Sequence, residues 1–214
     1  MRLIPLNRAP NYFPHVTGFA LGLGLLLLVW GCYIPLKACL AQFLLDAAWE
    51  RAQQHSEESD FKVQNIQPWP DADMYPVGKL QRVAHAEDWI VVGGGPARNL
   101  AFAPVWAEQS VRPGEPGIAL ISGHKDTQFG ALRTLTRGDL LRWTRADGSA
   151  VDFIVRDTAI VNATESRLAL EASGPARLVL VTCFPFDDSY GGPLRYLVLA
   201  EALPASPIVS VAGQ

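Results

Sequence analysis

The stretch from residue 16 to residue 36 constrains the fold more than any other feature, because it contains no charged side chain. It reads VTGFALGLGLLLLVWGCYIPL, a run of 21 residues. A helix rises about 1.5 Å per residue, so a run of this length can cross the roughly 30 Å hydrocarbon core of a bilayer. We therefore expect one transmembrane helix at 16–36.

The charges that flank this run predict its orientation. Arg2 and Arg8 precede it, whereas Asp46 and Glu50 follow soon after it. Positively charged residues beside a membrane span favour the cytoplasmic side. We expect residues 1–15 to be cytoplasmic and the bulk of the chain to lie on the extracytoplasmic side of the cytoplasmic membrane.

Two processed forms are the alternatives to an uncleaved anchor. A cleaved signal peptide would have a shorter apolar stretch that ends in a small-x-small site. The pairs Gly31–Cys32 and Ala38–Cys39 are compatible with a lipoprotein, but Trp30 and Lys37 before them fit a lipidation site poorly. The length of the run and its flanking residues favour the uncleaved anchor.

The rest of the chain divides by composition. Residues 37–70 are expected to form a helix and a linker: apolar residues recur every three or four positions over 38–54, and 56–60 is a polar spacer. Prolines then mark the beginning of the folded domain, which we place at 71–205, before a short C-terminal tail at 206–214.

The domain is expected to be mainly β. Asp147-Gly148 is a hairpin signal, and Phe129–Leu135 is expected to form one or two helical turns. A short helix with a loop is expected within Asn99–Glu108. The expected strands are Lys79–His85, Asp88–Val92, Gly117–Gly123, Leu140–Arg145, Ala150–Val155, Thr158–Asn162 (a continuation after a bend), Arg177–Thr182 and Arg195–Glu201.

This number of short strands favours a closed barrel or a sandwich. A Rossmann sheet is disfavoured because no long helices separate the strands. For the same reason Gly93-Gly94-Gly95, which opens no helix of a βαβ unit, does not predict nucleotide binding.

Charge and cysteine content exclude several functional classes. The net charge of −3 argues against nucleic-acid binding, which usually requires a basic patch. The chain has three cysteines, and two of them, Cys32 and Cys39, lie in or beside the apolar segment. A disulfide scaffold and a cysteine-based zinc cluster are therefore excluded, and we assign no cofactor and no metal.

A thiol, an imidazole and a guanidinium each lie at the edge of an expected strand. Cys183 ends one apolar run, His124 ends another, and Arg195 opens a third. A thiol nucleophile needs a proton partner and a cationic group near the developing oxyanion. We therefore take Cys183, His124 and Arg195 as candidate catalytic residues.

Each of these residues also has a plainer interpretation. An isolated cysteine is more often an inert core thiol, an isolated histidine a structural imidazole, and an isolated arginine an ion-paired one. His85, at a strand end, competes with His124 as the proton partner. The acids Asp126, Asp187 and Asp188 are read as solvated or capping residues, although one of them could pair with Arg195 or orient His124.

The order and spacing of these residues resemble the sortase family. His124-Lys125-Asp126-Thr127 is followed by Thr182-Cys183 and then by Arg195, so that the histidine, the cysteine and the arginine keep the family's order and intervals. The Gly-His-Lys-Asp-Thr sequence resembles class D and related sortases. Trp-Pro-x-Ala-Asp near residue 70 and the Phe-Asp-Asp loop with Gly-Gly-Pro-Leu-Arg resemble the single sortases of Gram-negative bacteria.

The resemblance implies a fold and an activity. The fold is an eight-stranded closed β-barrel with short helices, and the activity is that of a membrane-anchored cysteine transpeptidase. Cys183 would be the nucleophile, His124 the proton donor and acceptor, and Arg195 the group that stabilises the substrate or oxyanion. The partners would be a secreted protein with a C-terminal LPxTG-like sorting signal and an amine acceptor, on the periplasmic side of the inner membrane.

Three other functions remain alternatives. They are a papain-like or other cysteine peptidase, an L,D-transpeptidase, and a membrane-tethered β-domain that binds peptides without catalysis. An L,D-transpeptidase would have an arginine almost adjacent to the cysteine and a His-Gly pair just before it, and this sequence has neither. The exact sorting motif and the amine are not specified by the residues.

Overall fold

The computed structural model describes residues 13–56, 66–85, 87–95, 97–188 and 191–204. The chain divides into two compact units, Met1–Ala41 and Gln42–Gln214. Most of the expected cytoplasmic segment, part of the expected linker and the C-terminal tail lie outside the described residues, so the predictions for them stay predictions.

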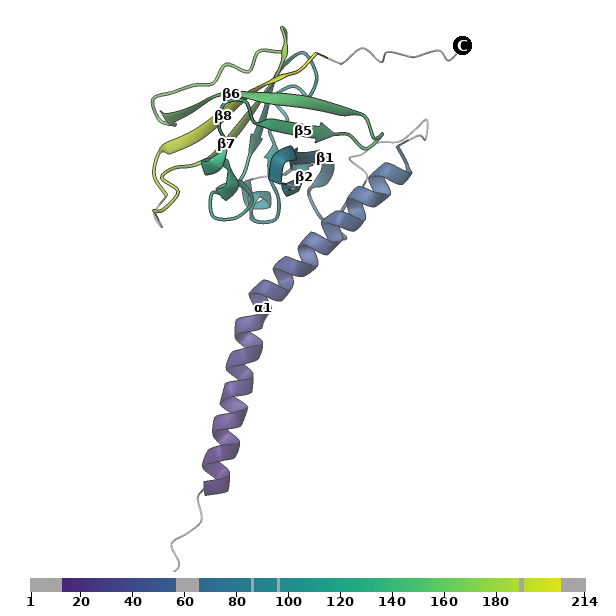
Figure 1. Cartoon of the computed structure of the whole chain (residues 1–214). Coiled ribbons are helices and arrows are strands. Elements are labelled where there is room, and N and C mark those ends of the chain that lie inside the picture. The colour runs from purple at the N-terminus through teal and green to yellow at the C-terminus, as the bar shows by residue number, and fades with distance from the viewer. Residues whose placement is uncertain (1–12, 57–65, 86, 96, 189–190, 205–214) are drawn as a thin grey trace, which may run out of the picture. The chain divides into compact units, whose positions relative to one another are not determined.

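The first element is a single long helix, α1 (Phe13–Gln54), shown in Figure 1. It joins the two helical stretches that the sequence suggested separately. Among the described residues, one helix is long and apolar enough to cross a membrane: Leu21–Gln54, with a mean hydropathy of 1.9 over its most apolar window. The expected N-terminal apolar helix is therefore present.

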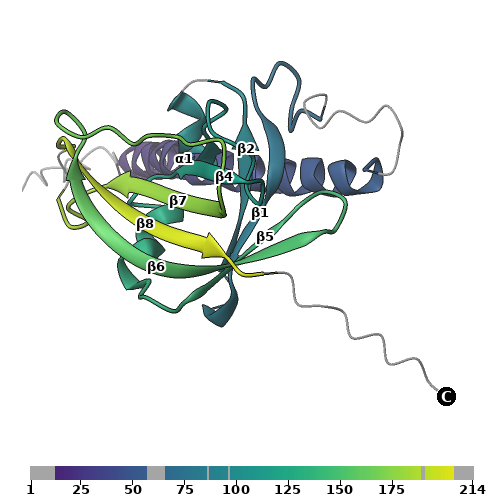
Figure 2. The ribbon, with the colours of Figure 1, turned by 90° about the horizontal axis from the view of Figure 1, so that it is seen from above.

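Eight strands within the described residues form a closed barrel in the order β1-β2-β3-β4-β7-β8-β6-β5, which confirms the expected mainly-β fold. Figures 1 and 2 show β6, β8 and β7 side by side, as their pairing requires. The strands are β1 (Tyr75–Arg82), β2 (Glu87–Gly93), β3 (Val105–Trp106), β4 (Gly117–Ser122), β5 (Leu140–Thr144), β6 (Ala150–Asn162), β7 (Ala176–Cys183) and β8 (Leu194–Ala202). Short 3₁₀ helices connect them: η2 (Val83–His85), η3 (Ala97–Ala101) and η4 (Gln128–Thr134).

The eight observed strands differ in three places from the expected eight. The first strand, expected at Lys79–His85, is shifted: β1 covers Tyr75–Arg82, and Val83–His85 forms η2 instead. Val105–Trp106 forms β3, a two-residue strand too short to leave an alternating pattern in the sequence. Ala150–Val155 and Thr158–Asn162 are one strand, β6, whose pairing with β8 shifts register between Val155 and Asp157. A β-bulge at this point explains the bend that the sequence suggested.

Strand alternation separates an apolar interior from the outer face of the barrel. On β7, Leu178 and Leu180 are fully buried in the interior core together with Ala119 and Ile121 of β4. The strands β4 and β7 run parallel, while β7 and β8 are antiparallel. The C-terminal ends of β4 and β7 therefore meet the N-terminal end of β8 at one end of the barrel.

A second core joins the C-terminal part of α1 to the barrel. Leu45, Trp49 and Ala52 pack with residues of β2 and of its surroundings. Gln42 Nε2 also donates a hydrogen bond to the carbonyl of Phe102 at 2.7 Å. The helix from Gln42 onward thus belongs to the same compact unit as the barrel. The partners in this core are Ala72, Met74, Ile90, Val92 and Ala103.

Candidate active site

Cys183 and Arg195 lie directly opposite each other on neighbouring strands. They are the last paired residues of the antiparallel β7–β8 ladder. Side chains that face each other in such a ladder have Cβ atoms about 4.5–5.5 Å apart. The short sequence interval between the two residues therefore corresponds to a hairpin whose loop brings the guanidinium back beside the thiol.

His124 follows the end of β4, the strand that lies beside β7 on the side opposite β8. The parallel β4–β7 ladder pairs Gly117 with Ala176 and Ser122 with Val181, and the offset between paired positions is constant. The pairing continues past the end of β4, since Gly123 N donates to Val181 O at 3.0 Å. The same offset aligns position 124 with position 183, so the sequence interval between the two residues is the register of the two strands.

Alternation gives Cys183 and Arg195 a common side of the sheet. Thr182, with its hydroxyl bonded to Gly123 O at 2.7 Å, and Tyr196 point towards the interior of the barrel. Cys183 and Arg195, the next positions, therefore belong to the outer face. The thiol is half-buried and the His124 side chain is exposed. The structure thus brings all three candidate residues to one end of the barrel.

Gly123 is required by the packing beneath this edge. A Cβ atom added there would lie 2.5 Å from the ring of Phe129, which is fully buried on η4. Phe129 N donates to the carbonyl of His124 at 2.9 Å. The glycine thus lets η4 pack closely under the loop that carries the histidine.

Arg195 is half-buried and bonds only backbone carbonyls within the described residues. Its Nη1 donates to Gly192 O at 2.7 Å and to Leu194 O at 2.8 Å. The nearby acid Asp187 instead pairs with Arg133, at 3.3 Å. Among the described residues, no carboxylate forms an ion pair with Arg195 or a hydrogen bond with the His124 ring.

The competing histidine, His85, has a different environment. It lies on η2, where its Nδ1 accepts a hydrogen bond from Arg82 Nη2 at 3.2 Å. Arg82 is 3% exposed and also donates to Glu87 at 2.8 Å. His85 thus belongs to an arginine–carboxylate cluster at the β1–β2 connection and not to the β4–β7–β8 edge.

Lys125 is a residue of this site that the sequence did not reveal. It follows His124 directly, yet its side chain is buried, and it bonds two carbonyls of the loop after Cys183. A lysine in the polar sequence Gly-His-Lys-Asp-Thr is typical of an exposed turn. The only signal for it was its place beside the candidate histidine.

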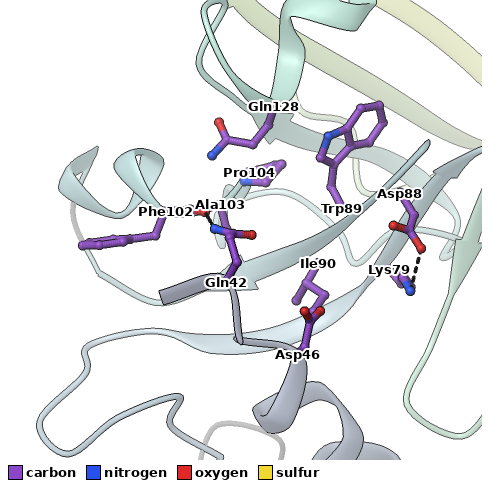
Figure 3. Close-up of a pocket in the computed structure, with 10 residues that line it drawn as sticks. All are labelled: Gln42, Asp46, Lys79, Asp88, Trp89, Ile90, Phe102, Ala103, Pro104 and Gln128. Carbon is purple, nitrogen blue, oxygen red and sulfur yellow. Dashed lines mark hydrogen bonds and ion pairs between the residues drawn. The ribbon is translucent and has the colours of Figure 1, made fainter. Parts of the chain in front are cut away.

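A separate pocket of about 180 Å³ lies between the C-terminal part of α1 and the β1–β2 hairpin. Figure 3 shows its mixed lining, with Lys79 and Asp88 paired at 2.6 Å. The candidate catalytic residues are not part of it. The lining residues are Gln42, Asp46, Lys79, Asp88, Trp89, Ile90, Phe102, Ala103, Pro104 and Gln128. The described residues hold no group of three or more acidic, histidine or cysteine side chains suited to a metal ion.

A closed barrel that gathers a cysteine, an arginine and a histidine at one edge of three adjacent strands is the scaffold of a thiol-dependent barrel enzyme. The family model of the sortase domain matches residues 81–203. This match covers more than half of the chain, and the chain therefore belongs to the sortase family, whose members are cysteine transpeptidases.

The similar proteins agree with this assignment. Sortase D of Bacillus subtilis (strain 168) is 32% identical over 111 residues, which cover 52% of this chain and 56% of the relative. The chain thus matches about half the length of this curated relative.

Solved structures support the fold. A sortase D5 transpeptidase of Clostridium perfringens has a TM-score of 0.60 at 15% identity and covers 75% of this chain and 99% of its own. Sortase A from Corynebacterium diphtheriae has a TM-score of 0.56 at 17% identity, covering 78% and 86%. Sortase A of Listeria monocytogenes has a TM-score of 0.52 at 20% identity, covering 60% and 88%.

Proposed function

We propose that this chain is a membrane-anchored cysteine transpeptidase that cleaves a C-terminal sorting signal of secreted proteins and transfers the acyl group to an amine. The signal is an LPxTG-like motif. The observation that carries the proposal is the pairing of Cys183 with Arg195 across β7 and β8 in a barrel of the sortase family. His124 follows the end of β4, whose ladder offset with β7 aligns position 124 with position 183.

The proposed chemistry begins with the thiol. A free cysteine has a pKa of about 8.5, so only a small fraction is thiolate at neutral pH and a proton partner is needed. His124 takes the proton of the Cys183 thiol, the thiolate Sγ attacks the backbone carbonyl carbon of the signal, and the carbonyl oxygen becomes an oxyanion beside Arg195. The guanidinium offers fixed, planar donors to this oxygen.

The second half of the cycle releases the products. As the tetrahedral intermediate collapses, the C–N bond breaks and His124 gives its proton to the leaving amine. A thioacyl-enzyme remains. The incoming amine attacks the thioester carbonyl and loses a proton to His124. The C–S bond then breaks, the departing Cys183 thiolate takes this proton, and a new amide bond remains.

The outer face beside Cys183 suits an extended peptide. Leu120, Val181 and Leu197 are half-buried on the same side of β4, β7 and β8 as the candidate residues. Partly exposed apolar side chains on the face of a sheet can bury an apolar side chain of a bound peptide. This surface supports an apolar residue in the sorting signal.

The proposed location follows from α1. The helix is long and apolar enough to span a bilayer, and the charges around it favour a cytoplasmic N-terminus. The barrel would then face the extracytoplasmic space, where secreted substrates carrying a sorting signal are available.

The test uses the full chain in detergent with fluorogenic peptides of the LPxTG type, with and without an added amine. We expect cleavage, an acyl adduct located on Cys183 by mass spectrometry, and an amine-ligated product. Cys183→Ala is expected to abolish all three, whereas Cys39→Ala, which removes an exposed thiol, leaves them unchanged.

Each other outcome points to another function. Cleavage that never yields an amine-ligated product would identify a peptidase. Tight peptide binding without an adduct would identify a non-catalytic binding domain. Turnover by Cys183→Ala close to that of the wild type would overturn the mechanism.

A further inference from the structure

Lys125 is a buried charge that the proposed chemistry does not use. Its residue is 6% exposed, although the neighbouring side chains of His124 and Asp126 are exposed. Removing an ammonium group from water is costly unless hydrogen bonds replace the lost hydration. Its bonding partners therefore explain why it is buried.

Those partners are main-chain oxygens of one loop. Lys125 Nζ donates to Pro185 O at 2.8 Å and also to Asp188 O. Both carbonyls belong to the connection between β7 and β8, which begins directly after Cys183. A bond from an ammonium to a carbonyl is a charge-assisted hydrogen bond, stronger than one between neutral groups.

The hydrogen bonds from Lys125 form one of two cross-links that lie on either side of His124 and Cys183. One position before Cys183, Thr182 Oγ1 donates a hydrogen bond to the carbonyl of Gly123, one position before His124, at 2.7 Å. This bond joins the end of β7 to the end of β4. One position after His124, Lys125 joins its segment to Pro185. The histidine and the cysteine thus lie between two cross-links that connect the end of β4 to the end of β7.

His124 lies outside the regular strands, where its carbonyl accepts a hydrogen bond from Phe129 N at 2.9 Å. This bond holds it to η4 but does not connect it to the loop after Cys183. Strand β4 ends at Ser122, two residues before His124, and η4 begins only at Gln128.

The loop after Cys183 is also held to β8, by the bond from Phe184 N to Leu194 O at 3.1 Å and by the packing of Phe186 on Tyr196 at 5.2 Å between ring centroids. Towards η4 it has an exposed ion pair of Asp187 with Arg133. An exposed ion pair contributes little. The contacts of Phe184 and Phe186 hold the loop to β8, whereas the Lys125 bonds join it to the segment that bears His124.

We propose that Lys125 is a positioning residue that ties the loop bearing His124 to the loop following Cys183 and so fixes the imidazole relative to the thiol. The inference rests on the proposed function for its catalytic consequence. Lysine suits this task because its compact ammonium has three donors and reaches two carbonyls at the end of a long apolar stem.

The first experiment measures the tie itself. Amide hydrogen exchange is followed by mass spectrometry in the full-length wild type, in Lys125→Met and in Lys79→Met. Methionine keeps an unbranched apolar stem without the charge, and Lys79 pairs with Asp88 away from the site. We expect faster exchange around Gly123–Thr127 and Phe184–Asp188 in Lys125→Met only, with the β5–β6 hairpin unchanged.

The second experiment measures the catalytic consequence with the sorting-signal peptides. A misplacement of about 1 Å can cost on the order of a hundredfold in rate, so we expect kcat to fall by about that factor in Lys125→Met. KM and the melting temperature change much less. Lys125→Arg, whose fork can donate to both carbonyls, is expected to retain most of the wild-type kcat.

The outcomes are distinguishable. Unchanged exchange in Lys125→Met, or altered exchange with wild-type kcat, would overturn the positioning role. A loss of activity that is matched by unfolding in the thermal measurement, or one that Lys125→Arg does not relieve, would reduce Lys125 to a structural residue and also overturn it. A wild type that cleaves no sorting-signal peptide would instead refute the proposed function, and hydrogen exchange would still decide whether the tie exists.

Discussion

At the scale of single residues, Arg82 and Arg195 show two different environments for an arginine of the barrel. Arg82 donates to the carboxylate of Glu87 at 2.8 Å, which neutralises its charge. Arg195 bonds backbone carbonyls through Nη1, and its Nε and Nη2 bond nothing within the described residues. A cation that has no carboxylate partner in the described part of the chain, and that lies opposite a thiol, is well placed to receive an oxyanion.

Replacing Arg195 with lysine tests this role. The variant keeps the charge but loses the planar fork, so we expect kcat/KM for the sorting-signal peptide to fall by about a hundred- to thousandfold with little change in melting temperature. Arg156→Lys is the matched control, because Arg156 forms an exposed pair with Glu201 at 2.8 Å. Near-native kcat/KM in Arg195→Lys would remove Arg195 from the catalytic set.

A second prediction at this scale separates the two histidines. Loss of a positioned general acid and base typically costs about 10²–10⁴ in rate, and we expect a loss in this range for His124→Ala. His85→Ala removes only an acceptor for Arg82 and is expected to keep most of its activity. The same peptide assay measures both variants. Should His85→Ala be the inactive one, the proton partner would be His85 and the assignment by strand register would fail.

At the scale of elements, apolar runs predicted the strands that carry the site. The ends of β4 and β7 were visible because an apolar run stops at His124 and at Cys183. Strand β3 was missed because Val105–Trp106 has no period, and β6 was divided because a bulge interrupts its alternation. The burial of Lys125 was beyond sequence reasoning, since its partners arrive from a distant loop, the one that follows β7.

The sequence predicted the apolar face of the C-terminal part of α1 but not the residues against which it packs. The three- and four-residue recurrence of apolar side chains predicted an apolar face on this part of the helix. Nothing local identified its partners, because Met74 and Ile90 lie on other elements of the fold. The compact unit that contains the barrel also includes the helix from Gln42 onward. The predicted boundary of the catalytic domain at residue 71 stays a prediction.

Trp49→Ala tests whether α1 contributes to the stability of the barrel unit. Trp49 is 6% exposed in the second core, and truncating a buried tryptophan typically costs about 3–5 kcal/mol. We expect a loss of this size in the free energy of unfolding of the full chain in detergent, measured with urea. Glu50→Ala, one position further on the exposed face, is expected to stay within about 0.5 kcal/mol of the wild type. Equal stabilities for the two variants would show that the helix does not support the barrel.

At the scale of the whole molecule, the proposed function depends on which side of the membrane the barrel faces. A transpeptidase for secreted proteins needs its thiol where the sorting signal emerges. The family assignment does not determine this side. The charges around the apolar span do make a prediction, since Arg2 and Arg8 precede it and acidic residues follow it.

Reporter fusions after Gln214 test this orientation directly. Alkaline phosphatase folds and becomes active only outside the cytoplasm, so we expect the full-length fusion to be active. A reporter that functions only in the cytoplasm is expected to be inactive at the same position. Reversing the flanking charges, with Arg2→Glu and Arg8→Glu, should lower phosphatase activity because positive residues hold the N-terminus in the cytoplasm. An active cytoplasmic reporter with an inactive phosphatase would place the barrel inside the cell, and the secreted-substrate proposal would then fail even if Cys183 proves to be a nucleophile.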